Sequence, residues 1–342
     1  MDIYGTIGPA CADVEILKQM FYHGMTGIRL NLSHTELSNC REWTEKIREA
    51  AEAAGICPRL LVDLQGPELR VGVLEYPLEL REQEKILLKP YKENMTSEEG
   101  TVPIPAPLFF AMKEKQQALL DDSKILLTVE ETDTEQIFCK VQRGGVLSSR
   151  KSIAVSGVEL ELPALTESDR KNIREAKEHG VTGVMLPFVR SCRDLQNLKQ
   201  ELADAGAEDL EIFAKIENMD GVRNLKSLLP CADQIVIARG DLGNSMPLWD
   251  LPAVQAEIAE VCRKEGKPFM VVTQMLASME NSKVPTRAEV SDIFQAVFQG
   301  ASSVMVTGET ASGSYPAEAV KYLCRTVESA QKYFKGESRR IT

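Results

Sequence analysis

Two carboxylates and a lysine, at the ends of two apolar runs, are the side chains of this chain best suited to chemistry. Lys215 and Glu217 follow the apolar run 212–214, and Asp241 follows a second run 24 residues beyond Glu217. Residues two apart in a β-strand point the same way, so Lys215 and Glu217 would leave a strand end together. For the Lys-x-Glu pair alone, a surface salt bridge is the simpler reading. With Asp241, the group could hold a divalent metal and anchor an anion.

Three polar side chains alternate with apolar ones in the run 26–33. Arg29, Asn31 and Ser33 would share one face of a strand there. A buried polar face is costly unless its groups bind something, although an exposed strand face fits the alternation equally well. Polar residues at the ends of other apolar runs favour a binding site. They are Asp63, Glu68 with Arg70, Thr273, and Thr307 with Glu309.

The residue types restrict the reaction. Carboxylates without a histidine or cysteine ligand set favour Mg²⁺ or Mn²⁺. Arg29 and Lys215 add positive charge, which suits a phosphoryl group in transfer. The sequence ARGDLG, residues 238–243, offers backbone N–H groups at the start of a short helix, where a carboxylate or phosphate binds readily. Of the three histidines only His34 follows a predicted strand end, so histidine acid–base chemistry is not favoured.

Composition narrows the class of protein. The chain has 342 residues and a net charge of −11, which argues against a nucleic-acid-binding surface. No apolar run approaches the roughly 18 residues of a membrane span, and the N-terminus lacks a signal-peptide pattern. The eight cysteines include no CxxC pair, so we expect neither a zinc site nor a disulfide framework, but reduced thiols in the cytoplasm.

Eight apolar runs alternate with eight helical patterns, which predicts an α/β fold of the (β/α)₈ TIM-barrel type. The runs are 2–8, 26–33, 59–66, 182–188, 211–217, 234–241, 269–275 and 303–310. The helical patterns are 12–24, 37–54, 166–179, 190–205, 218–229, 251–266, 286–299 and 316–334. Thr166 ahead of Asp169, and Thr286 ahead of Glu289, are helix-start signals of the capping-box type. A doubly wound open sheet is the alternative, but the eight units and the absence of a GxGxxG turn count against it.

One segment interrupts this alternation. Residues 72–155 hold short alternating runs separated by turn signals, which predicts a small β-barrel domain inserted after the third strand. Such an insertion, at the carboxyl ends of the barrel strands, would act as a lid. The predicted division is a catalytic barrel of residues 1–71 and 156–334, a lid of 72–155, and a polar tail of 335–342.

Nine motifs, in order and at the expected spacing, resemble pyruvate kinase over almost the whole chain. They are TIGP (6–9), GIRLNLSH (27–34), VDLQGPELRVG (62–72), LPALTESD (162–169), AKIEN (214–218), ARGDLG (238–243), TQML (273–276), PTRAEVSD (285–292) and TGETASGSYP (307–316). The resemblance implies a barrel with an inserted β-barrel lid. It also implies a glycolytic phosphotransferase that moves the phosphoryl group of phosphoenolpyruvate to ADP and protonates the enolate to pyruvate.

The resemblance also implies a role for each substrate-binding residue. Lys215 would neutralise the transferring phosphoryl group, and Arg29 would contact the phosphate. The backbone amides of Gly240 and Asp241 would receive the substrate carboxylate. Thr273 would join them and help to relay the proton. We expect Thr307 and Glu309 to orient their neighbours rather than to touch substrate.

Metal and nucleotide contacts follow from the same resemblance. Glu217 and Asp241 would hold the divalent metal, Mg²⁺ or Mn²⁺. A monovalent cation, K⁺, would be held by Asn31, Ser33, Asp63 and the carbonyl of Leu64. The nucleotide, ADP or ATP, would be met by Asn31, His34, Arg70 and Lys151. Lys151 has a simpler reading as a solvated charge of the lid, and Asn31 and Ser33 as the cap of a strand.

The sequence departs from the family pattern in four places. Gln65 stands where the family usually has a lysine, and Lys151 is followed by Ser-Ile-Ala rather than Gly-Val-Asn. Glu68 accompanies potassium dependence in the family, whereas Leu64 is commoner without it. The chain starts at the first strand, with Asp2 where the family has a lysine before TIGP. It ends near the last barrel helix, so we expect no sugar-phosphate effector site of the usual kind.

Three functions remain open at this point. The first is a pyruvate kinase without allosteric control, in which a homo-oligomer is compatible with the family but the usual tetramer loses part of its interface. The second is a barrel lyase, of decarboxylase or aldolase type, that handles an enol or pyruvate without using ADP. The third is a non-catalytic homologue that binds phosphoenolpyruvate. Retention of Lys215, Glu217, Asp241 and Thr273 together argues against the third.

Overall fold

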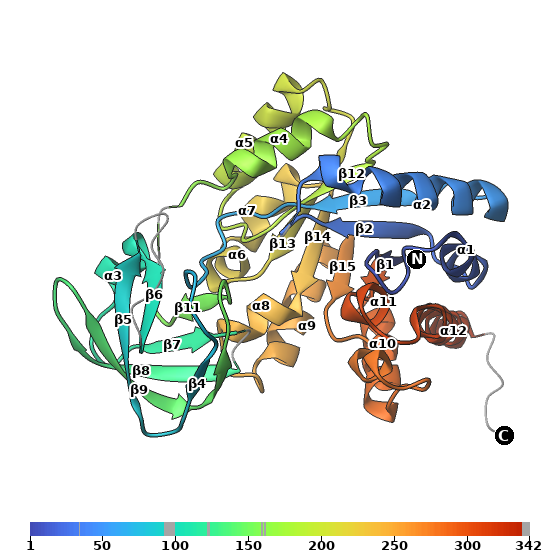
Figure 1. Cartoon of the computed structure of the whole chain (residues 1–342). Helices are drawn as coiled ribbons and strands as arrows, with labels where there is room; N and C mark the ends of the chain where they lie inside the picture. Colours follow the sequence, from blue (N-terminus) through green and yellow to red (C-terminus); the bar gives the residue numbers. More distant parts are fainter. Residues whose placement is uncertain (34, 92–99, 122–123, 159, 161, 337–342) are drawn as a thin grey trace. The chain divides into compact units, whose positions relative to one another are not determined.

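The structure is a computed structural model that describes residues 1–33, 35–91, 100–121, 124–158, 160 and 162–336. These residues divide into two compact units (Figure 1). The first comprises Met1–Gly66, Ala164–Gly243 and Leu248–Thr342, and the second comprises Pro67–Pro163 with Asn244–Pro247. The chain therefore leaves the first unit shortly after its third strand and returns to it almost a hundred residues later.

The first unit is a closed barrel of eight parallel strands among the described residues, as predicted. The strands are β1 (Asp2–Thr6), β2 (Gly27–Asn31), β3 (Arg59–Asp63), β12 (Gly183–Leu186), β13 (Glu211–Ile216), β14 (Gln234–Ala238), β15 (Phe269–Val272) and β16 (Ser303–Met305). Their order around the barrel is β1-β16-β15-β14-β13-β12-β3-β2. Each strand lies within one of the eight apolar runs, because only continuous apolar segments can be buried against both the interior and the helices.

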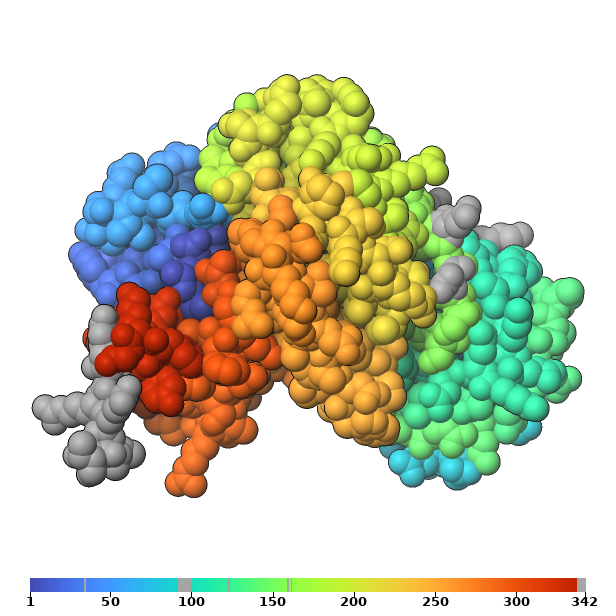
Figure 2. Space-filling view, turned by 180° about the vertical axis from the view of Figure 1, so that it is seen from behind, coloured from blue at the N-terminus to red at the C-terminus, as the bar shows by residue number. Residues whose placement is uncertain are grey.

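Helices cover the outside of this barrel, and the longer ones follow the predicted patterns, whereas the short helices at 277–280 and 308–311 lie outside them. The longer ones are α1 (Val14–Tyr22), α2 (Arg41–Ala54), α4 (Glu167–Glu175), α5 (Cys192–Asp204), α9 (Leu251–Lys264), α10 (Arg287–Phe298) and α12 (Pro316–Phe334). Shorter ones are α6 (Met219–Arg223), α7 (Leu225–Leu228), α8 (Arg239–Asn244), α11 (Gly308–Ala311), η1 (Leu37–Cys40), η2 (Leu229–Cys231) and η3 (Ala277–Glu280). The predicted start signals act as capping boxes, with Thr166 and Asp169 at α4 and Thr286 and Glu289 at α10. In Figure 2 the segments from α6 to α10, yellow to orange, cover one face of this unit.

Large side chains fill the barrel interior. Tyr4, Phe213, Met185 and Met270 belong to one cluster of buried residues, and each is fully buried. Gly27 and Gly183 make room for them, since a Cβ at Gly27 would lie 2.3 Å from the Tyr4 ring and one at Gly183 would lie 2.8 Å from the Phe213 ring. The interior is thus a packed core, and space for chemistry remains only at the strand ends.

The second unit is β-rich, as expected for the inserted domain. A mixed six-stranded sheet has the order β11-β7-β8-β9-β5-β6, and β10 pairs with β4 in a separate two-stranded sheet. Its strands are β4 (Leu78–Leu80), β5 (Lys85–Tyr91), β6 (Thr101–Pro105), β7 (Gln117–Leu120), β8 (Ile125–Thr132), β9 (Ile137–Arg143), β10 (Gly145–Leu147) and β11 (Ile153–Val155). A short helix, α3 (Ala106–Ala111), was not anticipated. The unit has its own core, which includes Leu88, Val102, Leu127 and Val141.

The expectation of reduced thiols is wrong at two positions. Cys192, at the start of α5, and Cys231, at the end of η2, form a disulfide across 39 residues of sequence. The other six cysteines are free. Sequence spacing could not reveal this pair, because the folding of two outer barrel segments brings the two thiols together. No helix among the described residues is long and apolar enough to cross a membrane.

Candidate active site

Lys215 and Glu217 leave the end of β13 side by side, as their spacing predicted. Lys215 Nζ lies 2.9 Å from Glu217 Oε1. The other oxygen of Glu217 accepts a 2.8 Å hydrogen bond from the backbone N–H of Phe188, in the loop after β12. Glu217 is only 3% exposed. The pair is therefore not a surface salt bridge but part of a buried cluster.

Asp63, at the end of β3, joins this cluster to β2. Its carboxylate accepts from Arg29 Nε at 2.8 Å and lies 2.7 Å from Arg29 Nη2. Lys215 Nζ lies 3.1 Å from each oxygen of the same carboxylate. Arg29 Nη1 also donates to the hydroxyl of Thr6 at the end of β1, at 3.1 Å. Three predicted residues, Arg29, Asp63 and Lys215, thus meet at the carboxyl ends of separate strands.

Burial and the neighbouring charges shift the pKa of each of three side chains in this cluster. Burial raises the pKa of Glu217 to about 7, and the negative charges of Asp241 and Asp63 add to this effect while Lys215 opposes it. Burial also acts to lower the pKa of Lys215, but Asp63 and Glu217 outweigh it and the pKa is raised. For Asp63, burial acts to raise the pKa, but Lys215 and Arg29 outweigh it and the pKa is lowered. Lys215 therefore stays cationic, whereas the surroundings of Glu217 disfavour its charged form.

Gly240, Asp241 and Thr273 come from two neighbouring strand ends. Gly240 and Asp241 lie in the first turn of α8, which begins immediately after β14. Thr273 directly follows β15 and has a φ of 81°. A Cβ on Gly240 would lie 3.1 Å from Thr273 Cγ2, so the Thr273 side chain packs closely against the backbone of Gly240. The predicted carboxylate-binding turn and the predicted hydroxyl are thus adjacent.

The predicted monovalent-cation ligands lie around the ends of β2 and β3. The Ser33 N–H and hydroxyl both donate to Asn31 Oδ1, at 3.2 and 2.9 Å. Asn31 is paired with Asp63 in the β2–β3 register. Leu64 is buried, and its N–H donates to the carbonyl of Met185 at 3.1 Å. The Asp63 carboxylate, however, already contacts Arg29 and Lys215.

The predicted nucleotide contacts fall in two units. Asn31 belongs to the barrel, and His34 lies outside the described residues. In the second unit Arg70 is paired with Glu68 at 2.6 Å, and Lys151 with Asp121 at 2.9 Å. The segments that carry Arg70 and Lys151 are adjacent, because the Val71 N–H donates to the Lys151 carbonyl at 2.8 Å.

The donor set fits a divalent ion of the Mg²⁺ type. Among the described residues no group of three or more His, Cys, Asp or Glu side chains could hold a metal by itself. Mg²⁺ does not need such a group, since one or two carboxylates together with substrate phosphate and water satisfy it. Glu217 and Asp241 supply two carboxylates, and their mutual repulsion is the kind that a cation relieves.

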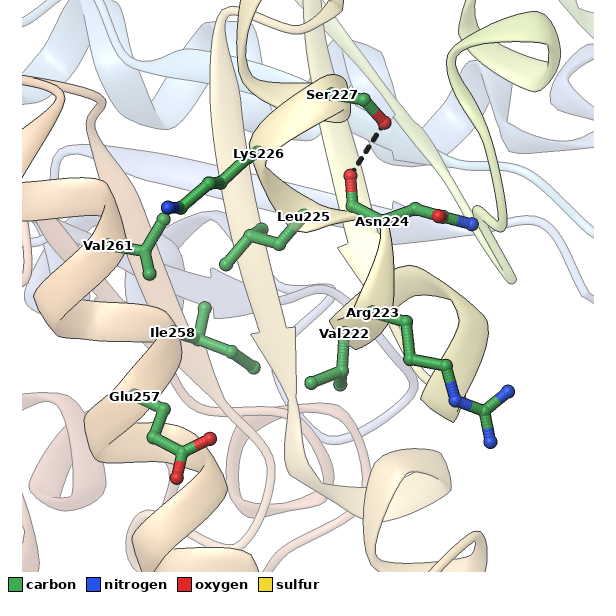
Figure 3. Close-up of a pocket in the computed structure, with 9 residues that line it drawn as sticks. All are labelled: Val222, Arg223, Asn224, Leu225, Lys226, Ser227, Glu257, Ile258 and Val261. Atoms are coloured by element: carbon green, nitrogen blue, oxygen red, sulfur yellow. Dashed lines mark hydrogen bonds between the residues drawn. The ribbon is translucent and has the colours of Figure 1, made fainter.

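A separate cavity of about 340 Å³ lies on the outside of the barrel, between α6–α7 and α9. Figure 3 shows Val222, Leu225 and Ile258 pointing toward one another, while the charged ends of Arg223 and Glu257 lie at its margin. None of the predicted site residues is among the residues that line it. The carboxyl ends of the strands remain the candidate site.

The family model for the barrel domain of pyruvate kinase matches residues 1–320. The chain belongs to the pyruvate kinase family. It is 39% identical to pyruvate kinase of Geobacillus stearothermophilus over 92% of this chain and 54% of that protein, and 37% identical to that of Aeropyrum pernix over 96% and 70%. A crystal structure of a pyruvate kinase from Cryptosporidium parvum superposes with a TM-score of 0.89 at 32% identity, covering 97% of this chain and 69% of that one. The chain thus spans about half of the first of these relatives and about 70% of the others.

Within this pyruvate kinase barrel, several residues that support the site were missed by sequence reasoning. Asp169 accepts from the backbone N–H groups of Gln65 and Gly66 at 2.7 and 3.1 Å, which fixes the loop after Asp63. Phe188, whose N–H holds Glu217, has a φ of 52°. The capping-box pattern identified Asp169 as a helix-start residue. Its second set of partners lies more than a hundred residues away in sequence, so no local pattern could show it.

Glu309 is another supporting residue, as expected for a group that orients its neighbours. It is 1% exposed and accepts from the Leu276 N–H at 2.9 Å and from the Thr307 N–H at 2.6 Å. These bonds tie the loop after β15 to the loop after β16. The Thr273 loop is thus braced from the adjoining strand end.

Proposed function

We propose that this chain transfers the phosphoryl group of phosphoenolpyruvate to ADP in a divalent-metal-dependent reaction. The observation that carries the proposal is the buried cluster of Arg29, Asp63, Lys215 and Glu217 at the carboxyl ends of β2, β3 and β13. Buried charges are costly to a fold, and preorganised cations at such a place suit a phosphoryl group in transfer. The family membership supports the same reaction.

In this proposal an oxygen of the ADP β-phosphate attacks phosphorus, and the bond from phosphorus to the enol oxygen breaks. Lys215 and Arg29, held by Asp63, offset the negative charge of the phosphoryl group. The N–H groups of Gly240 and Asp241 receive the substrate carboxylate. The enolate then takes a proton at its terminal carbon, which gives pyruvate, and Thr273 helps to relay that proton.

Glu217 and Asp241 would hold the divalent metal, Mg²⁺ or Mn²⁺, which when bound would screen the negative charge shared by substrate and carboxylates. The Lys215–Glu217 contact keeps Glu217 oriented toward the strand end. K⁺ is the second proposed cofactor, at Asn31, Ser33, Asp63 and the carbonyl of Leu64. Lys215 and Arg29 already balance the charge of Asp63, so K⁺ would add a third cation beside this carboxylate.

The second unit would act as a lid that supplies nucleotide contacts. We propose that residues 72–155 have this role and that Arg70 and Lys151 meet the nucleotide together with Asn31 and His34. The barrel of residues 1–71 and 156–334 would be catalytic, and 335–342 a polar tail, of which only 335 and 336 are described. The proposed setting is glycolysis in the cytoplasm.

The test is pyruvate formation from phosphoenolpyruvate and ADP with Mg²⁺, with and without K⁺. The Lys215→Met variant should lose about 10²–10³-fold or more in kcat. Lys177→Met removes an exposed lysine paired with Asp209 and serves as the control, which should keep full activity. The ratio of rates with and without K⁺ decides between the opposite expectations from Glu68 and Leu64.

Absence of ATP formation by the unaltered chain, across nucleotides and cations, would overturn the kinase proposal. Metal-dependent proton exchange on pyruvate, or decarboxylation of oxaloacetate, would then identify the enol-handling lyase. Binding of phosphoenolpyruvate without either reaction would identify the non-catalytic homologue.

A further inference from the structure

The loop that follows β15 begins in an unfavourable backbone conformation. Thr273 and Gln274 have φ values of 81° and 54°, in the left-handed region that residues with a Cβ seldom adopt. Two such residues in succession persist only where the surroundings impose the conformation. Thr273 is also the proposed proton-relay hydroxyl, so whatever imposes this geometry acts on the reaction.

Arg239 makes the contact that holds this turn. Its Nε and Nη2 donate to the carbonyl of Thr273 at 3.2 and 2.6 Å, and Nη2 also lies 3.0 Å from Met275 Sδ. Its Nη1 donates to both oxygens of Asp292 at 2.8 and 2.7 Å. These contacts engage all three guanidinium nitrogens, so the Arg239 side chain serves the loop rather than a ligand.

Asp292 fixes the far edge of the guanidinium. It lies on α10 (Arg287–Phe298), and the Arg239 side chain is 12% exposed while that of Asp292 is 32% exposed. The guanidinium group is planar, so a carboxylate bound on one side of it also fixes the direction of the donors on the other side. Arg239 is also the residue that precedes Gly240 and Asp241, so its position sets the first turn of α8 as well as the Thr273 turn.

We propose that Asp292 is a positioning residue that acts through Arg239. Through Arg239, it fixes the position of the Thr273 hydroxyl relative to the N–H groups of Gly240 and Asp241. The close approach of Gly240 to Thr273 means that a displaced guanidinium would disturb both partners at once. This inference rests on the proposed function for its effect on catalysis, and on the loop geometry alone for its effect on structure.

The test is a double-mutant cycle of Asp292→Asn and Arg239→Met. Asp292→Asn keeps the shape of the side chain but removes one acceptor oxygen and the charge. We expect kcat for pyruvate formation to fall about 10- to 100-fold, because small misplacements of catalytic groups have effects of this size. KM for ADP should change less than about twofold, since Asp292 acts at the turn proposed to bind the substrate carboxylate, not at the nucleotide contacts. The double variant should be no worse than Arg239→Met alone, because Asp292 acts through Arg239.

The matched control is Glu201→Gln. Glu201 is a carboxylate of similar setting, paired with Arg170 between the outer helices α4 and α5. We expect it to leave kcat unchanged. Equal losses of kcat in Glu201→Gln and Asp292→Asn, or additive losses in the cycle, would overturn the positioning role.

The contacts from Asp292 through Arg239 to the Thr273 carbonyl form a clamp on the loop after β15. Amide hydrogen exchange tests this clamp without requiring activity. Asp292→Asn should speed exchange in the segment 275–279, where the Leu276 and Ser278 amides are hydrogen-bonded in the loop, and Glu201→Gln should not. Unchanged exchange there would overturn the clamp even in an active enzyme. Faster exchange in a chain that makes no pyruvate would retain the clamp and reject the proposed function.

Discussion

The same two barrel strands carry an ion pair at each end, and the two pairs differ sharply. At the amino ends of β3 and β13, Arg59 pairs with Glu211, and their side chains are 42% and 41% exposed. At the carboxyl ends, Asp63 pairs with Lys215, and their side chains are 2% and 13% exposed. The strands are parallel members of one barrel, so all their carboxyl ends lie at one end of it and all their amino ends at the other.

The difference in burial shows which of the two ion pairs is costly to the stability of the fold. An exposed pair keeps most of its hydration and contributes between zero and about 1 kcal/mol to stability. A buried pair loses that hydration, and well-packed apolar residues would often serve the fold as well or better. The carboxyl end also holds Glu217, whose burial beside two other carboxylates raises its pKa to about 7. Charges kept in such surroundings point to chemistry at that end.

The largest expected contrast is in activity, between variants of two carboxylates: Glu217, which directly follows β13, and Glu211, the first residue of that strand. Glu217→Gln should lower kcat/KM for pyruvate formation about 10³-fold or more, because it removes a proposed metal ligand and a partner of Lys215. Glu211→Gln, six residues earlier, should leave activity within about twofold, since its pair is exposed and remote from the substrate. Steady-state rates at saturating Mg²⁺ measure both. Similar losses in the two variants would break the comparison.

A second contrast is in folding stability. Asp63→Asn should lower the free energy of unfolding by about 3 kcal/mol, because Arg29 and Lys215 would remain buried without the carboxylate they share. Glu211→Gln should lower it by less than about 1 kcal/mol. Urea unfolding followed by tryptophan fluorescence or circular dichroism gives the two values. A cost for Asp63→Asn no greater than that for Glu211→Gln would contradict the account.

Metal binding sharpens the same comparison. Mg²⁺ should raise the melting temperature of the unaltered chain over that in EDTA, through about 1–3 kcal/mol of ligand stabilisation at saturating concentrations. Glu217→Gln should lose this response, and Glu211→Gln should keep it. A response retained by Glu217→Gln would place the metal elsewhere than the carboxyl ends of the strands.

The smallest effect concerns salt. The coupling energy between Arg59 and Glu211, from a double-mutant cycle, should be about 0.5 kcal/mol at low ionic strength and close to zero in about 1 M NaCl. The coupling between Asp63 and Lys215 should change much less, because salt hardly screens a buried pair. Equal salt sensitivity at both ends would mean that the carboxyl end is as well hydrated as the amino end.

Much of this architecture follows from local patterns. Eight apolar runs gave the eight barrel strands because a strand buried on both faces is apolar along most of its length. Capping boxes at Thr166 and Thr286 marked the starts of α4 and α10 because their bonds join residues three apart. The spacing of Lys215 and Glu217 likewise gave their shared direction.

Other features have no local signal. Asp169, Arg239 and Asp292 read in sequence as ordinary charged residues at helix starts and on helix faces. Their partners in the site lie between about 30 and 100 residues away. The Cys192–Cys231 disulfide was missed for the same reason.

The sequence by itself determined the barrel, the inserted β domain and the strand ends at which chemistry is placed, because periodicity and turn signals act over a few residues. Only the tertiary structure decided that Asp63 is shared by Arg29 and Lys215 and that Arg239 is gripped between Thr273 and Asp292. Burial and electrostatic balance depend on which segments close around a side chain, and that is fixed only when the strands form a ring.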